Sequence, residues 1–224
     1  AVLYCHGGGY TSGNLGYSRV LSSKLAHATG YDVLSFEYRL APEFPYPAAV
    51  EDALRAWDHL MLLGYGARDV VLAGDSAGGN LALVLCNRLK TAGRKLPGAL
   101  ILMSPWTDMT MSGQSYTERA EIDPMLTPEY IEAVRLAYAA GRDYRSSDLS
   151  PLFADFPGFP PTLIQVGDHE ILYSDAEMLC HALERAGVPC RFEVSEGMWH
   201  VFQMFPLRKA AAAMESVARF LLER

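Results

Sequence analysis

Short apolar runs alternate with longer amphipathic stretches from one end of the chain to the other. The apolar runs predict six β-strands, at residues 1–5, 32–37, 70–74, 99–104, 162–166 and 191–195. The stretches between them repeat apolar side chains at helical spacing and predict helices near residues 18–29, 47–63, 77–91, 127–140, 174–186 and 207–223. Strands and helices that alternate in this way build a mostly parallel sheet with helices on both faces, so we expect an α/β fold.

Residues 105–161 depart from this alternation. The segment contains one expected helix and is rich in proline, at positions 105, 124, 128, 151, 157, 160 and 161. Proline interrupts regular structure because its ring fixes φ and removes a hydrogen-bond donor. We therefore expect a cap-like insertion that lies over the strand ends. The 224 residues otherwise fit a single domain spanning 1–224.

Composition and charge exclude some classes of function. A net charge of −7 without a cluster of Lys and Arg argues against binding of nucleic acid. No apolar run reaches the roughly 18 residues that a membrane-spanning helix needs. The four cysteines lack a C-x-x-C pair, which favours reduced thiols and a cytoplasmic location but leaves export open. The chain begins inside a predicted strand at Ala1, so we expect a fragment of a longer protein.

The sequence Gly74-Asp75-Ser76-Ala77-Gly78 lies between a predicted strand and a predicted helix. A strand, a Gly-x-Ser-x-Gly turn and a helix in this order predict a nucleophile elbow, with Ser76 held at the top of the sheet. The helix N-terminus adds positive dipole and free N–H groups beside the serine. A phosphate-binding loop is the alternative, but the turn has no neighbouring lysine. We therefore expect Ser76 to be a catalytic nucleophile.

The glycine run His6-Gly7-Gly8-Gly9 directly follows the first predicted strand. Glycines let backbone N–H groups approach a reacting carbonyl oxygen, and such a loop supplies half of the oxyanion hole beside a nucleophile elbow. The predicted donors are the backbone amides of Gly8, Gly9 and Ala77. His6 is expected to shape the loop through hydrogen bonds rather than to act as the base.

A serine nucleophile needs a base and an acid, which follow it in the chain in the order acid, then histidine. Of six histidines, His200 follows the last predicted strand and is the expected base. Asp168 and Glu170 both follow strand 162–166 and are candidate acids, whereas Asp175 is better interpreted as a favourable charge at a helix start. A metal site at Asp168, His169 and Glu170 is a weaker alternative because no further ligands accompany them.

Four motifs together resemble the bacterial hormone-sensitive-lipase-like esterases: the His6–Gly9 run, Tyr38-Arg39-Leu40-Ala41-Pro42-Glu43, the extended elbow Gly74–Asn80, and Ser104-Pro105-Trp106. The resemblance covers nearly the whole chain. It implies the α/β-hydrolase fold and a serine carboxylesterase that hydrolyses short- to medium-chain carboxylic esters. It also implies a small-molecule ester substrate, no cofactor, no metal and a possible homodimer.

The chain departs from this family in two places. The resemblance implies an N-terminal cap and two further strands, which we expect to be missing from the given sequence. The family's acid segment reads Asp-Pro-Leu-Arg-Asp-Glu and opens nine positions after a proline, which places Glu170 nine after Pro161 as the implied acid. Asp168 stays the alternative acid, since one loop insertion would reverse the alignment. Arg39 is expected to pair with a carboxylate as part of the architecture.

Other functions of the same scaffold stay open at this point. Deacetylase, amidase and lactonase activities use the same machinery on other acyl groups, and the sequence does not choose among them. A hydrolase-like binding protein without catalysis is a further alternative. The presence of His200 argues against it, because the binding proteins of this type have lost the catalytic histidine.

Overall fold

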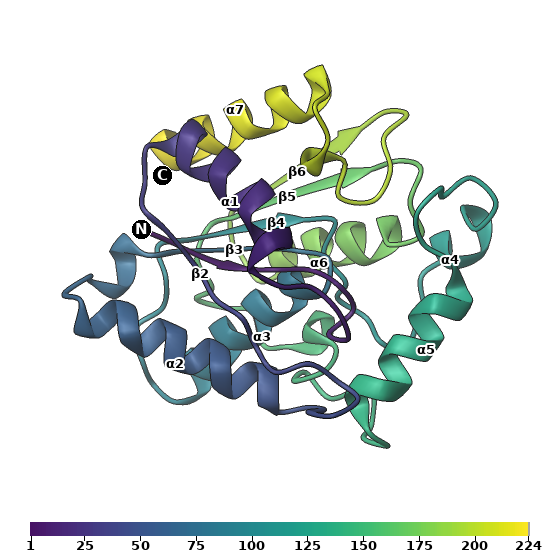
Figure 1. Ribbon diagram of the computed structural model, residues 1–224, viewed down its shortest axis with the longest axis horizontal. Coiled ribbons are helices and arrows are strands. Elements are labelled where there is room, and N and C mark those ends of the chain that lie inside the picture. The colour runs from purple at the N-terminus through teal and green to yellow at the C-terminus, as the bar shows by residue number, and fades with distance from the viewer. Residues whose placement is uncertain (224) are drawn as a thin grey trace.

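The structure, a computed structural model, describes residues 1–223 and arranges six strands in one sheet. The strands are β1 (Val2–Cys5), β2 (Val33–Ser35), β3 (Val71–Asp75), β4 (Ala99–Met103), β5 (Thr162–Gly167) and β6 (Cys190–Ser195). Their order across the sheet is β2-β1-β3-β4-β5-β6, and all neighbours run parallel. The predicted parallel sheet is confirmed, and the carboxyl ends of its strands meet at one edge (Figure 1).

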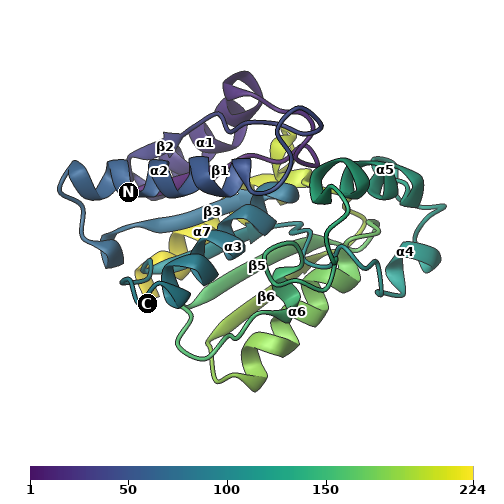
Figure 2. The same ribbon diagram turned by 90° about the horizontal axis from the view of Figure 1, so that it is seen from below.

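Helices cover both faces of the sheet, as predicted. Helices α1 (Leu15–Thr29) and α7 (Arg208–Glu223) pack together on one face. Helices α2 (Ala48–Leu62), α3 (Ala77–Thr91) and α6 (Tyr173–Arg185) lie on the other face (Figures 1 and 2). None of the helices within residues 1–223 is both long and apolar enough to cross a lipid bilayer.

The side chains of the central strands divide between two apolar cores. In β3, Leu72 packs towards α2 and α3, whereas Val71 and Ala73 pack towards α1 and α7. The same alternation runs through β1 and β4, where every residue is buried. Successive side chains of a strand point to opposite faces, so a strand covered on both sides must be apolar throughout. This burial explains why the strands appear in the sequence as unbroken apolar runs.

Two elements differ from the predicted bounds by more than one residue. The strand expected over 32–37 ends at Ser35, because β2 is an edge strand that pairs only with β1, and β1 turns into the glycine run after Cys5. Helix α1 begins at Leu15 rather than near residue 18. The side chain of Asn14 accepts a hydrogen bond from the Tyr17 amide at 3.0 Å and caps the helix there.

Residues 105–161 connect β4 to β5. They contain the expected helix, α5 (Pro128–Ala139), which Thr127 caps by accepting from the Tyr130 amide at 3.2 Å. They also contain the short helix α4 (Ser115–Glu118), which the sequence analysis did not predict. Both helices lie at the end of the molecule towards which the carboxyl ends of the strands point (Figures 1 and 2).

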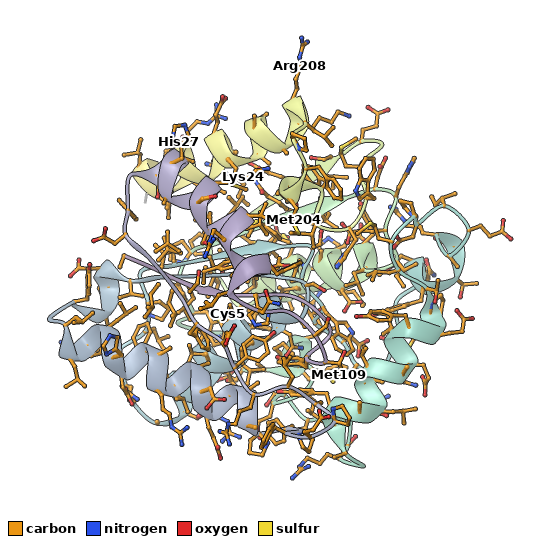
Figure 3. All side chains as sticks on the ribbon, viewed as in Figure 1. Cys5, Lys24, His27, Met109, Met204 and Arg208 are labelled. Atoms are coloured by element: carbon orange, nitrogen blue, oxygen red, sulfur yellow. The ribbon has the colours of Figure 1, made fainter. Side chains whose placement is uncertain are left out.

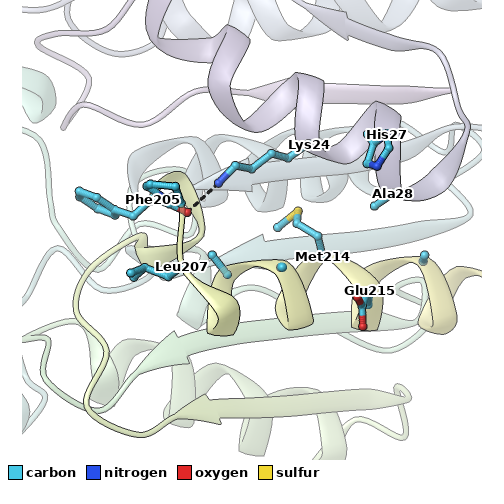
Figure 4. A pocket seen from close by; sticks show the side chains of 11 residues that line it. Lys24, His27, Ala28, Phe205, Leu207, Met214 and Glu215 are labelled. Carbon is cyan, nitrogen blue, oxygen red and sulfur yellow. Dashed lines mark hydrogen bonds between the residues drawn. The ribbon is translucent and has the colours of Figure 1, made fainter.

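A surface groove of about 630 Å³ is lined by residues of α1, of the segment just before α7 and of α7 itself. Figure 4 shows that Lys24 of α1 reaches across this groove. Its ammonium donates hydrogen bonds to the carbonyl oxygens of Gln203 at 2.6 Å and Phe205 at 2.9 Å. Lys24 therefore secures the turn around Met204 (Figure 3), which follows the predicted base His200.

Candidate active site

Ser76 lies on a sharp turn between the end of β3 and the start of α3. Its backbone angles are φ 55° and ψ −123°, which residues other than glycine rarely adopt. A β-carbon on Gly74 would lie 2.2 Å from the carbonyl oxygen of Gly78, and one on Gly78 would lie 2.1 Å from that of Cys5. The two glycines are therefore required by close packing, and they hold the serine in a strained conformation.

The glycine run continues β1 and lies beside this turn, because Cys5 of β1 is in register with Gly74 of β3. Gly8 has a φ of 115°, a conformation that glycine adopts at low cost. Among the interactions of residues 1–223, the amides of Gly8, Gly9 and Ala77 donate to no protein acceptor. These three N–H groups are therefore candidate donors to an oxygen atom of a ligand.

The buried carboxylate of Asp75 links the glycine run to the serine turn. It accepts hydrogen bonds from the Gly7 amide at 3.0 Å, from the Tyr17 hydroxyl at 2.6 Å and from the Tyr4 hydroxyl. Burial raises the pKa of Asp75, while the two tyrosines and the nearby His200 oppose that rise. Asp75 thus fixes the distance between the two halves of the expected oxyanion hole.

His6 is buried against the aromatic ring of Tyr38. The two rings stack with centroids 4.1 Å apart, and the Tyr38 hydroxyl donates to the His6 carbonyl oxygen at 2.6 Å. The Nδ1 atom of His6 lies 2.7 Å from the Gly7 carbonyl oxygen and donates to it. Burial lowers the pKa of His6, which favours the neutral ring. These contacts agree with a role in shaping the glycine run.

His200 and Glu170 form a buried pair at the carboxyl edge of the sheet. The His200 Nδ1 atom lies 2.8 Å from Oε2 of Glu170, whose side chain is fully buried. The second oxygen, Oε1, accepts from the Gly167 amide at 2.7 Å and from the Ser104 hydroxyl at 2.8 Å. With three donors around it, the carboxylate holds the imidazole ring in one orientation.

Ser104 is a site residue to which the sequence analysis assigned no role. Besides donating to Glu170, its hydroxyl accepts from the Val201 amide at 3.0 Å. It therefore joins the acid to the residue that follows His200. Ser104 and Val201 have φ values of 48° and 50°, which is unusual for both and especially for a β-branched residue. The signal that the sequence offered for Ser104 was its position at the end of β4, the strand beside β5.

Asp168, the alternative acid, has another partner. Its Oδ1 atom accepts from the Gly197 amide at 2.6 Å and lies 3.9 Å from Nε2 of His169. The structure therefore brings Glu170, and not Asp168, to His200, while Asp168 ties the loop after β5 to the loop after β6. Within residues 1–223, no three His, Cys, Asp or Glu side chains are grouped as a metal site requires.

The insertion between β4 and β5 contacts both halves of this site. Asp123 accepts from the Ile171 amide at 2.8 Å, and the Arg119 guanidinium donates to the Asp168 carbonyl oxygen. At the other half, a β-carbon on Gly9 would lie 3.0 Å from the Val134 side chain of α5. The insertion therefore braces the loop that carries Glu170 and packs against the glycine run.

Asp175, predicted as a favourable first-turn charge, lies in the first turn of α6 but is fully buried. Its Oδ2 atom accepts from the amides of Thr107 at 2.7 Å and Asp108 at 2.8 Å. Burial raises the pKa of Asp175 to about 8; the Asp108 carboxylate adds to the rise, and the two amides and the Tyr116 hydroxyl oppose it. The folded protein therefore holds a proton here that the unfolded chain releases near pH 4.

This difference predicts a pH-dependent loss of stability. Between about pH 4 and pH 8 the folded state binds more protons than the unfolded state at Asp175, so the free energy of unfolding falls as the pH rises. Replacing Asp175 by asparagine removes the titration and keeps an oxygen for both amides. We expect wild type to lose stability relative to Asp175→Asn, on the order of a few kcal/mol, between pH 5 and pH 8.5 in urea titrations. Parallel pH profiles would contradict this assignment.

Comparison with known proteins adds independent findings. A family described as alpha/beta hydrolase fold matches residues 2–204. An acetyl-hydrolase of Streptomyces hygroscopicus is 41% identical over 222 residues, which are 98% of this chain and 74% of that protein. An esterase of Acinetobacter venetianus is 38% identical over 223 residues, 98% of this chain and 73% of that protein.

Solved structures are similar over nearly the whole chain. A crystal structure of an esterase from the bacterial hormone-sensitive lipase family superposes with a TM-score of 0.96 at 40% identity, covering 99% of this chain and 76% of that one. Another crystal structure, of a hormone-sensitive lipase from a metagenome library, gives 0.96 at 35% identity and covers 99% and 77%. The strand order and the flanking helices are thus shared with proteins described as esterases and lipases.

Proposed function

This chain belongs to the α/β-hydrolase fold family, and on that premise we propose that it is a serine carboxylesterase acting on short- to medium-chain carboxylic esters. The observation that carries the proposal is the buried hydrogen bond between His200 and Glu170, at the same sheet edge as the strained turn of Ser76. A base held by an acid, at the sheet edge where a serine hydroxyl also lies, is the arrangement that acyl transfer needs.

The proposed reaction has two halves. The Ser76 hydroxyl oxygen attacks the ester carbonyl carbon, and Nε2 of His200 takes the hydroxyl proton, because Nδ1 is bonded to Glu170. The carbon–oxygen bond to the alcohol then breaks, and the alcohol leaves with that proton. Water attacks the acyl-serine in the same way, His200 removes a proton from the water, and the carboxylic acid leaves while Ser76 regains its hydrogen.

The proposed role of the glycine run is to stabilise the negatively charged intermediates of this reaction. Negative charge develops on the carbonyl oxygen only as the tetrahedral intermediate forms, so donors placed for that oxygen lower the barrier. The unpartnered amides of Gly8, Gly9 and Ala77 are the proposed donors. The role proposed for Glu170 is to fix the tautomer of His200 and to stabilise its positive charge after it takes the serine proton.

The insertion and the relatives bear on substrate choice. We propose that residues 105–161 form part of a cover over the acyl site, since α5 packs on Gly9. The acetyl-hydrolase relative makes small acetyl esters a specific second candidate substrate, on the same machinery. Amidase and lactonase activities would use the same machinery on other acyl groups. We further propose a homodimeric state and a cytoplasmic location.

A panel of p-nitrophenyl esters from acetate to palmitate, together with an anilide analogue, tests the proposal. We expect kcat/KM to be highest between acetate and hexanoate and at least about tenfold lower for palmitate. A fluorophosphonate probe should add to the protein once per chain, with the added mass on the peptide that contains Ser76. Absence of ester hydrolysis by the folded protein, or labelling at another residue, would refute it.

A further inference from the structure

Asn80 is a fully buried polar residue in the first turn of α3, four positions after Ser76. Its amide nitrogen donates to the carbonyl oxygens of Trp106 and Leu149, both at 2.9 Å. Its amide oxygen accepts from the Tyr10 hydroxyl at 2.7 Å. The three partners lie outside its own helix, 26, 69 and 70 residues away along the chain.

The bond to Tyr10 reaches the glycine run directly, because Tyr10 follows Gly9. Tyr10 has a φ of 63°, a conformation that is strained for a bulky side chain and persists only where the surroundings enforce it. Three contacts do so here. Its ring stacks on Tyr138 with centroids 3.7 Å apart, its carbonyl oxygen accepts from the Ala41 amide at 2.9 Å, and its hydroxyl is held by Asn80.

The other two bonds of Asn80 hold the insertion. Trp106 lies at its beginning and Leu149 near its end, so one amide group joins both to α3. Trp106 is in turn bonded to the elbow, since its amide donates to the Ser76 carbonyl oxygen at 3.1 Å. The side chain of Asn80 thus lies where the elbow helix, the glycine run and the insertion meet.

We infer that Asn80 is a positioning residue for the oxyanion hole, which through Tyr10 sets the amides of Gly8 and Gly9 against Ser76 and Ala77. The inference rests on the proposed esterase function. A buried amide with every hydrogen atom bonded admits only one arrangement of its partners, because any shift leaves a polar group unsatisfied. The donors are therefore in place before the transition state forms, which is what makes such donors effective.

Tyr10→Phe is the most selective test. It removes the hydroxyl bonded to Asn80 and keeps the ring that stacks on Tyr138. Asn80→Ala removes all three bonds. Asn87→Ala is the matched control, since Asn87 is a buried asparagine two turns further along the same helix and contacts neither the glycine run nor the insertion through a side-chain hydrogen bond within residues 1–223.

With p-nitrophenyl butyrate we expect kcat to fall roughly 10-fold for Tyr10→Phe and roughly 100-fold for Asn80→Ala, with KM changed less than about threefold, because loss of a whole oxyanion donor costs about 10²–10³-fold. Affinity for a trifluoromethyl ketone, which mimics the tetrahedral intermediate, should fall in proportion to kcat/KM. Asn87→Ala should keep wild-type kcat at a similar thermal midpoint.

The outcomes separate the two proposals. A folded wild type without esterase activity refutes the proposed function. An active wild type refutes the inference about Asn80 if Tyr10→Phe keeps kcat within twofold, if its loss appears in KM alone, or if kcat falls while ketone affinity does not. Tyr10→Phe decides the question even where Asn80→Ala does not fold.

Discussion

Replacing Ser76 by alanine is expected to lower kcat for p-nitrophenyl butyrate by at least about 10⁴-fold, with any residual rate coming from the oxyanion donors and binding alone. No acyl-enzyme can form without the hydroxyl, so the burst of p-nitrophenol at high enzyme concentration should disappear as well. Stopped-flow measurement of the burst amplitude, together with steady-state turnover, provides the check.

The strained backbone at Ser76 supplies a control for folding. Alanine must keep φ 55° and ψ −123° at the cost of strain, whereas glycine adopts such angles readily. We expect Ser76→Gly to be as inactive as Ser76→Ala and at least as stable in urea titrations. Ser23→Ala, on the exposed side of α1, should keep full activity. Near-wild-type turnover by either Ser76 variant would refute the assignment of the nucleophile.

The main helices and strands could be predicted because each is long enough to show its period and packs against the rest of the fold on defined faces. Strand β3 is buried on both faces, so its sequence is continuously apolar, and α3 begins where its pattern predicts. Helix α4 has only four residues, too few for a helical period to show, and its packing comes from Ser115, which exchanges hydrogen bonds with Ser174. Contacts of this kind depend on the tertiary structure.

The candidate site likewise contains residues whose roles local motifs indicated and residues whose roles depend on the tertiary structure. The elbow and the glycine run are local motifs, and their positions relative to predicted strands indicated their roles. Glu170 and Asp168 are two positions apart on one loop, and the direction of each side chain depends on how that loop pairs with the chain after β6. In the structure the His169 amide donates to the Met198 carbonyl oxygen at 2.9 Å, which helps to set the path of this loop. Nothing local in the sequence shows that pairing.

Polar residues inside the fold were the hardest to interpret. Ser104 and Asn80 appeared in the sequence as parts of longer motifs and received no separate role. Each acts by bonding segments far apart in the chain: Ser104 joins Glu170 to Val201, and Asn80 joins Tyr10 to the insertion. A buried polar group is informative because it must find partners, but only the folded structure shows which partners they are.

The second large loss of activity is expected when Glu170 is replaced. In Glu170→Gln the amide oxygen can still accept from the Gly167 amide and the Ser104 hydroxyl, so the loop should keep its shape. The amide nitrogen then faces Nδ1 of His200 and donates to it. That bond places the imidazole proton on Nε2, the nitrogen that must accept the serine proton. We expect kcat to fall about 10³–10⁴-fold, with the urea midpoint close to wild type.

Asp168→Asn is the matched comparison, since it makes the same chemical change two positions away. Its amide oxygen still accepts from the Gly197 amide. Residue 168 makes no hydrogen bond to His200 whose direction the substitution could reverse. We expect kcat to stay within about tenfold of wild type. The reverse pattern, with Asp168→Asn inactive and Glu170→Gln active, would make Asp168 the acid. Because both variants lose one negative charge on the same loop, a difference between them reports the direct contact of Glu170 with His200, which fixes the tautomer and stabilises the imidazolium, rather than the net charge of the loop.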